Sequence, residues 1–198
     1  VDLAFLYRTD DFDLGNRRAQ FSFGTNLSNI GPGIQYTDNA QKDPLPTVLR
    51  AGFAFDMDLD EEGFNTITLA TDVSKIMARQ EVVIENGDTT GFRAVSPIES
   101  IFQSWDTFSR PTGLGDLAEL NLLQQLMIGV GAEYWYNDQF ALRTGYYYED
   151  PNNGDRKFLT FGAGLRYDFF GVDFSYIQTL EEDHPLAGTL RFSVLLNF

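Results

Sequence analysis

The sequence predicts an all-β protein, a transmembrane antiparallel up-and-down β-barrel, and three observations predict it. Apolar and polar residues alternate with a period of two along most of the 198 residues. The apolar positions hold many rings, since aromatic residues make up 15% of the chain. The mean hydropathy is nevertheless only -0.22, and the chain has no uninterrupted apolar run of about 20 residues that would predict a membrane-spanning helix.

The alternation defines segments that we expect to be strands, most of them about 9–11 residues long, the length with which a tilted strand crosses a bilayer. One face of each segment is apolar and aromatic, and the other is small, polar or charged. The nine expected strands lie at residues 1–8, 20–27, 48–57, 66–73, 126–136, 140–148, 159–167, 172–176 and 190–198.

The polar face carries charges in most of these strands. A soluble β-sandwich would turn its apolar face inward, whereas in a transmembrane barrel the rings face lipid and the charges face the lumen. The repetition of the pattern favours the barrel. The expected lumen-facing charges are Arg50, Asp72, Glu133, Arg143, Arg166, Asp173 and Arg191. We expect a salt-bridge network, because charges withdrawn from water must be paired; an ion- or solute-selective pore is the alternative.

Short and long connections alternate along the chain. Turns at residues 137–139 and 168–171 are short, which is typical of the periplasmic end, and the longer connections are typical of the extracellular end. The last strand should end in the periplasm, and nine is an odd number. We therefore expect residues 1–198 to be the C-terminal part of a single barrel domain whose N-terminal strands are missing, with a miscount of one strand as the alternative.

The longest connection, about residues 76–122, is expected to be an irregular extracellular loop. Loops of this length are usually functional or disordered. This one holds Phe92, Phe102, Trp105 and Phe108, and exposed aromatic side chains favour packing on a partner, on a plug or on the barrel's own mouth.

Composition and motifs argue against an enzyme. The chain has no cysteine, which excludes a disulfide framework, a thiolate zinc site and a cysteine nucleophile. A formal net charge of -15 argues against nucleic-acid binding. The single histidine, His184, lies in an expected loop without a G-x-S-x-G element. We predict no catalytic residue and no cofactor.

An acidic stretch, residues 56–63, resembles the start of a calcium-binding loop. Glu61 stands at the sixth position, where such a loop needs glycine, and Ile67 stands at the twelfth, where it needs glutamate. We expect a solvated acidic turn and predict no metal site.

Several segments, taken in order and spacing over nearly the whole chain, resemble the PorV (LptO) family of the type IX secretion system. These segments are residues 25–31, 34–38, 45–46, 49–52, 71–75, 131–140, 143–146, 162–166 and 184–192. The resemblance implies a FadL-like barrel, with 14 strands in the family, in the outer membrane of a Gram-negative, Bacteroidota-like bacterium. Phe192 and the terminal Phe198 also resemble the signal that the barrel-assembly machinery reads.

The resemblance further implies a function. PorV-like proteins dock on the SprA translocon, bind the C-terminal signal domain of exported proteins and deliver these proteins to a surface attachment (sortase) complex. Membrane lipid and lipopolysaccharide would surround such a barrel. The alternative function is a FadL-like channel for hydrophobic or small polar solutes. A shuttle should recover secreted proteins and a large barrel when it is isolated, whereas a channel should conduct or take up ligand.

Overall fold

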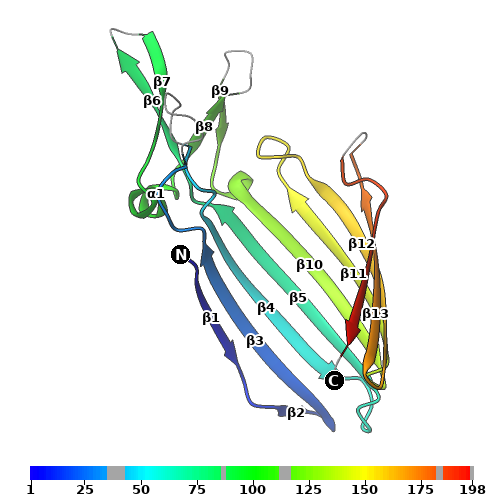
Figure 1. Ribbon diagram of the computed structural model, residues 1–198. Helices are drawn as coiled ribbons and strands as arrows, with labels where there is room; N and C mark the ends of the chain where they lie inside the picture. Colours follow the sequence, from blue (N-terminus) through cyan, green and yellow to red (C-terminus); the bar gives the residue numbers. More distant parts are fainter. Residues whose placement is uncertain (35–42, 86–87, 112–116, 182–184, 197–198) are drawn as a thin grey trace. The chain divides into compact units, whose positions relative to one another are not determined.

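The computed structural model describes residues 1–34, 43–85, 88–111, 117–181 and 185–196. For residues 80–85, 88–92, 94, 108–111 and 117–118 it describes the backbone alone. Nine long strands form one antiparallel up-and-down sheet in the order β1-β3-β4-β5-β10-β11-β12-β13-β14 (Figure 1). The strands are β1 (Leu3–Arg8), β3 (Arg17–Ser28), β4 (Val48–Asp58), β5 (Asn65–Ile76), β10 (Leu126–Tyr136), β11 (Phe140–Glu149), β12 (Lys157–Tyr167), β13 (Phe170–Thr179) and β14 (Thr189–Leu196).

The predicted all-β fold and its nine strands are confirmed, with one addition. A three-residue strand, β2 (Phe12–Leu14), pairs with the start of β3. Gly15 has a φ of 69°, and this left-handed conformation lets the chain turn back within two residues. The sequence did not predict β2 because three residues are too few to show a period of two.

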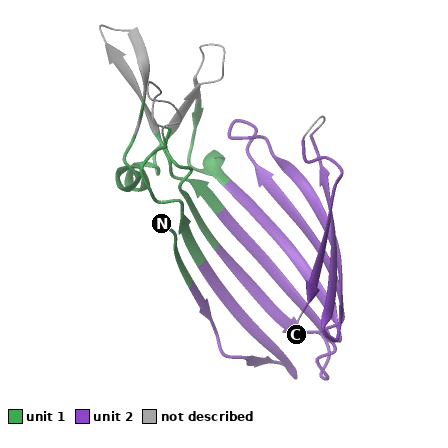
Figure 2. Cartoon of the chain, viewed as in Figure 1, with its two compact units in different colours: residues 1–5, 25–51, 74–126 green, residues 6–24, 52–73, 127–198 purple. Residues whose placement is uncertain are grey.

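The chain divides into two compact units (Figure 2). The first consists of residues 1–5, 25–51 and 74–126, and the second of residues 6–24, 52–73 and 127–198. In the second unit, the turns that follow β4, β10 and β12 lie at one end, and the longer connections that follow β11 and β13 lie at the other. The predicted alternation of short and long connections is therefore present in this unit.

The connection between β5 and β10 is more regular than the sequence predicts. It holds two hairpins, β6 (Gln80–Glu85) with β7 (Asp88–Ala94) and β8 (Phe108–Pro111) with β9 (Leu117–Leu120). Between the hairpins lies the helix α1 (Pro97–Gln103), and the 3-10 turn η1 (Leu123–Gln125) leads into β10. The Ser96 side chain caps α1 by accepting a hydrogen bond from the Glu99 amide, and Pro97 occupies a position at the helix start where its missing N–H does no harm.

The apolar face of the sheet is the exposed face. On β11, Leu142 is 61% exposed, whereas Ala141 on the opposite face is 1% exposed. Aromatic rings also meet across neighbouring strands, as Phe23 and Phe53 do at 5.1 Å between ring centroids. In the described part of the chain the buried hydrophobic side chains are Ala19, Met77, Val95, Leu120, Met127 and Ala141. An exposed apolar face and so small a core do not fit a soluble sandwich, and they agree with part of a barrel whose outer face meets lipid.

The helices that the structure describes are short, and none is long and apolar enough to cross a membrane. In the sheet of nine long strands with β2, the described edges are β1 and β14.

The turn between β10 and β11 fixes the register of these two strands. Asn137 and Asp138 have φ angles of 50° and 54°, and the Gln139 amide donates to the Tyr136 carbonyl at 3.0 Å. Positive φ at both central residues is the mark of the tight turns that match the twist of a hairpin. The register then pairs Tyr136 with Phe140, and every pair further along the two strands follows from it.

A valine at position 138 should weaken this turn. Asp138→Val places a β-branched side chain in the left-handed region, and we expect it to lower the free energy of unfolding by about 1–2 kcal/mol. The matched control, Asp138→Gly, should leave that free energy unchanged or raise it. Urea unfolding in lipid vesicles, followed by heat-modifiable gel mobility, measures both variants. Equal stabilities for the two would contradict the positive-φ turn.

Candidate functional site: a charged network on the polar face

Four charged side chains meet on the polar face of the sheet, one from each of β10 to β13. They are Glu133, Arg143, Arg166 and Asp173. The strand register places Glu133 opposite Arg143 and Gly164 opposite Asp173. Because side chains of alternate residues point to the same face, the pairing of the strands brings the four together.

The four side chains form one continuous chain of ion pairs. The Arg143 Nε donates to Glu133 Oε2, and its Nη1 donates to Asp173 Oδ1 at 2.8 Å. Arg166 Nη2 donates to the other oxygen of Asp173 at 2.7 Å. Two arginines face two carboxylates, so the formal charge of the network is zero.

Trp135 completes this network and is not among the seven charges that the sequence predicts for this face. Its indole N–H donates to Glu133 Oε1 at 2.8 Å. The guanidinium carbons of Arg143 and Arg166 lie 5.3 and 5.6 Å from its ring centroid, within range of cation–π attraction. The signal was present in the sequence, because Trp135 follows Glu133 by two residues and therefore shares its face.

Glycines make room for the arginines to lie flat on the sheet. A Cβ at Gly164 would lie 2.7 Å from Asp173 Oδ1 and 2.9 Å from Arg143 Nη1. A Cβ at Gly171 would lie 2.9 Å from the Arg166 Cδ. Glycine on the polar face of β12 and β13 is therefore a condition for the network, as expected where another group approaches a strand closely.

The other three predicted lumen charges lie elsewhere. Asp72 on β5 lies against Gly129, where a Cβ would be 2.5 Å from its Oδ2. Arg50 on β4 and Asp72 each take part in an interaction, and neither is free. Arg191 on β14 pairs in register with Ser175, is exposed, and has no ion-pair partner among the described residues. The structure thus brings four of the seven charges together.

The chemistry available to this network is structural. Each of its carboxylates accepts hydrogen bonds, and its side chains are 24–34% exposed. A satisfied network of this kind stiffens the wall that carries it. Within the described ranges, no group of three or more acidic or histidine side chains is arranged to hold a metal ion.

The acidic stretch at the end of β4 directs its carboxylates to separate partners. Asp56 accepts from the Thr68 hydroxyl at 2.6 Å, and Asp58 lies 3.4 Å from the Arg18 Nε. Asp60 accepts from the side chain and the backbone of Asn65. The side-chain hydrogen bond from Asn65 is the main reason that the pKa of Asp60 is lowered from its ordinary value.

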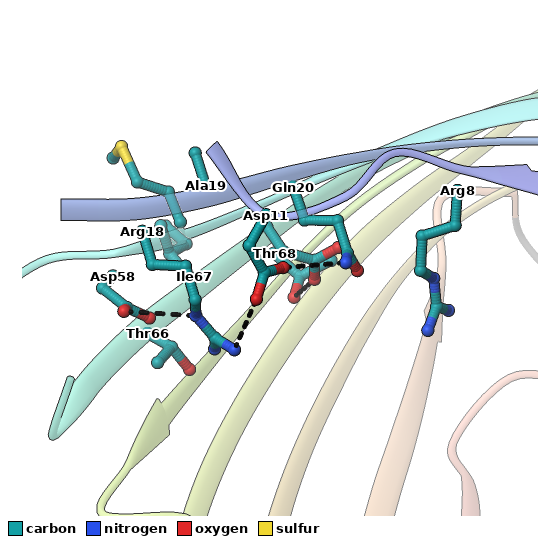
Figure 3. A pocket seen from close by; sticks show the side chains of 11 residues that line it. Arg8, Asp11, Arg18, Ala19, Gln20, Asp58, Thr66, Ile67 and Thr68 are labelled. Carbon is teal, nitrogen blue, oxygen red and sulfur yellow. Dashed lines mark hydrogen bonds and ion pairs between the residues drawn. The ribbon is translucent and has the colours of Figure 1, made fainter. Parts of the chain in front are cut away.

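A polar cavity of about 400 Å³ lies beside this stretch in the second unit (Figure 3). Arg18 points into it between Asp58 and Asp11, with the Asp11 contact at 3.6 Å. The Gln20 side chain donates to the other oxygen of Asp11 at 2.9 Å. Most of its lining side chains are charged or hydroxylic, so the cavity suits water and small polar molecules better than a hydrocarbon chain.

The four aromatic residues of the β5–β10 connection lie on different elements. Phe102 is in α1 and is 77% exposed, and Trp105 just beyond α1 is 47% exposed. Phe92 lies in β7 and Phe108 in β8, where the structure describes the backbone alone.

One of the two residues of the expected assembly signal lies on the last described strand. Phe192 on β14 is exposed on the apolar face, and its ring centroid is 5.3 Å from that of Phe174. Phe198 and His184 lie outside the described residues.

Comparison with known families identifies the first part of the chain. Residues 1–82 match the family model described as type IX secretion system protein PorV. This match supports the PorV family that the sequence predicts. The match runs from β1 through β5 to the start of β6, so the charged network of β10 to β13 lies beyond it. A search of curated proteins found no match.

The match to the PorV family gives the fold a context. The matched family is a component of type IX secretion, and it points to an outer-membrane protein of that system. The β-rich structure is compatible with this location.

Removal of the central arginine, Arg143, should break the network and destabilise the folded protein. Arg143→Met leaves Glu133 and Asp173 without their shared cation, and we expect the free energy of unfolding to fall by about 1–3 kcal/mol, less than for a fully buried pair because the site is partly hydrated. The matched control is Arg191→Met on the same face, which should change that free energy by no more than about 0.5 kcal/mol. Urea unfolding in lipid vesicles measures both. Equal losses for the two arginines would refute a specific role for Arg143.

Proposed function

We propose that the chain acts as an outer-membrane shuttle of the type IX secretion system. In this proposal it docks on a SprA-type translocon, binds the C-terminal signal domain of exported proteins and delivers these proteins to the surface attachment (sortase) complex. The match of residues 1–82 to the PorV family carries the proposal. The internally paired charges on the polar face support it, because they describe a stiff wall better than a reactive centre.

The segment between β5 and β10 supplies the proposed partner contacts. Phe102 and Trp105 are exposed aromatic side chains, and large aromatic side chains are the commonest anchors of protein interfaces. Phe92 and Phe108 are proposed as further contacts from the two hairpins of the same segment.

The edges of the sheet support a larger barrel. β1 and β14 are edge strands of the described sheet, and a strand edge exposed to lipid would leave backbone N–H and C=O groups without partners. We therefore propose that further strands of the same barrel domain pair with β1 and β14. Phe192 and Phe198 would then belong to the assembly signal of its closing strand.

A channel for small polar solutes is the second candidate. The polar cavity lined by Arg18 and its aspartates favours it over transport of hydrophobic solutes. Purified protein in a planar bilayer separates the candidates, since a channel conducts and a shuttle with a filled lumen does not.

Depletion of the protein should block surface attachment. We expect exported proteins that carry a C-terminal signal domain to accumulate unattached when the protein is absent, and re-expression of the wild-type chain to restore attachment. Immunoblotting of periplasm, surface and medium measures this distribution. An unchanged amount of attached protein in the depleted cells would contradict the shuttle.

A further inference from the structure

The short helix α1 turns its small polar side chains toward its own unit. Ser100 and Ser104 are each 1% exposed. The Ser104 hydroxyl donates to the Met77 carbonyl at 2.6 Å, and the Ser100 hydroxyl donates to the Pro97 carbonyl at 3.0 Å. A surface helix usually packs its apolar stripe against its own core. Here the serines occupy that inner position.

The apolar stripe of α1 therefore faces outward. It consists of Ile98 and Phe102, which lie one turn apart on the same side of the helix, and of Trp105 just beyond the helix end. Their exposed fractions are 69%, 77% and 47%. These three side chains are here called the α1 stripe. Exposed apolar groups gathered in this way indicate an interaction site.

The α1 stripe stands on a fixed support. The Asp106 carbonyl, one residue after Trp105, accepts from Arg79 Nη2 at 3.1 Å and from Gln125 Nε2 at 3.0 Å. Gln125 also donates to the Leu120 carbonyl at 2.9 Å and accepts from the Lys75 ammonium. These bonds tie the end of α1 to η1 and to the end of β5. A stripe that is held in place in the free protein loses little conformational freedom when a partner binds it.

The charges around the α1 stripe select the kind of partner. Glu99 in α1 and Asp106, next to Trp105, are exposed acids, and the chain as a whole carries a net charge of -15. Arg79, the cation bound at Asp106, already donates to a backbone carbonyl. An anionic lipid surface would be repelled by such a border, whereas a protein groove with basic residues at its rim would complement it.

We infer that the α1 stripe is a docking site for an apolar groove, rimmed by lysine or arginine, on a protein partner in the outer membrane or at the cell surface. This inference rests on the proposed function and specifies where and by what chemistry the chain binds. The stripe enters the groove in the manner of other helix-in-groove contacts, with Ile98, Phe102 and Trp105 as anchors. The acidic side chains border the stripe and set its orientation in the groove.

A photoreactive side chain at the centre of the stripe tests the inference. We would place benzoylphenylalanine at position 102 of the full chain in living cells, irradiate the cells and identify the cross-linked peptides by mass spectrometry. Leu180, which is 55% exposed in the β13–β14 connection, is the control position. We expect cross-links from position 102 to one protein segment rich in apolar and basic residues, and none to that segment from position 180. Cross-links to lipid or lipopolysaccharide, or no cross-link beyond the control, would overturn the inference.

Two substitutions then test the chemistry of the contact. Phe102→Ala should lower the amount of the cross-linked partner that co-purifies with the chain at least about tenfold, as for an interface anchor. Glu99→Lys should lower it about threefold or more at low salt and make the association less sensitive to salt. The controls are Leu180→Ala and Glu62→Lys, both expected to bind as the wild type. If Glu99→Lys binds as the wild type, the inference that the partner's groove has a basic rim is wrong.

The outcomes separate this inference from the shuttle function. If depletion blocks surface attachment but position 102 gives no protein cross-link, the function stands and the α1 stripe is not its docking site. If position 102 cross-links to a basic-rimmed groove but depletion leaves attachment intact, the surface stands and the shuttle function fails. Heat-modifiable gel mobility of each variant confirms that the barrel is folded.

Discussion

The pairing of backbone groups is the constraint on which this structure depends. In a bilayer, each N–H and C=O must find a partner within the protein, because the hydrocarbon offers none. The continuous antiparallel order from β1 to β14 satisfies these groups strand by strand. The same pairing forces side chains to alternate between two faces, so that one rule gives both the apolar exposed face and the polar face.

The polar face shows how backbone pairing brings charged side chains together. Arg143 contacts Glu133 on one neighbouring strand and reaches Asp173 two strands away. It spans this distance because the strand between them presents Gly162 and Gly164 beneath its side chain. A network that is neutral and internally bonded supports the wall of a barrel.

The sequence predicted what depends on local periodicity and missed what depends on pairing. Nine strands follow from a period of two, which every long strand displays. The hairpins β6–β7 and β8–β9 lie in a segment without a clear pattern, and they exist because two short strands meet. Likewise, α1 is only seven residues long, too short for its stripe to stand out before the inward Ser100 and Ser104 are known.

The charged network was predictable in its members and not in its partners. The alternation of faces along each strand places Glu133, Arg143, Arg166 and Asp173 on one face. Which of these side chains contact one another depends on the register between the strands. The turn at Asn137 and Asp138 sets that register for β10 and β11 through two positive φ angles. Arg191 lies on the same face but apart from the network, because the residue opposite it on β13 is Ser175.

The assignment of the apolar face to lipid and of the polar face to water is the central claim. Because the chain has no cysteine, single cysteines can be placed and spin-labelled without background. Positions 172 and 194 lie on the apolar face and positions 175 and 193 on the polar face. In lipid vesicles, labels at 172 and 194 should respond to oxygen, which concentrates in lipid, and labels at 175 and 193 to a water-soluble nickel complex. The same response at all four positions, or the reverse pattern, would contradict the account.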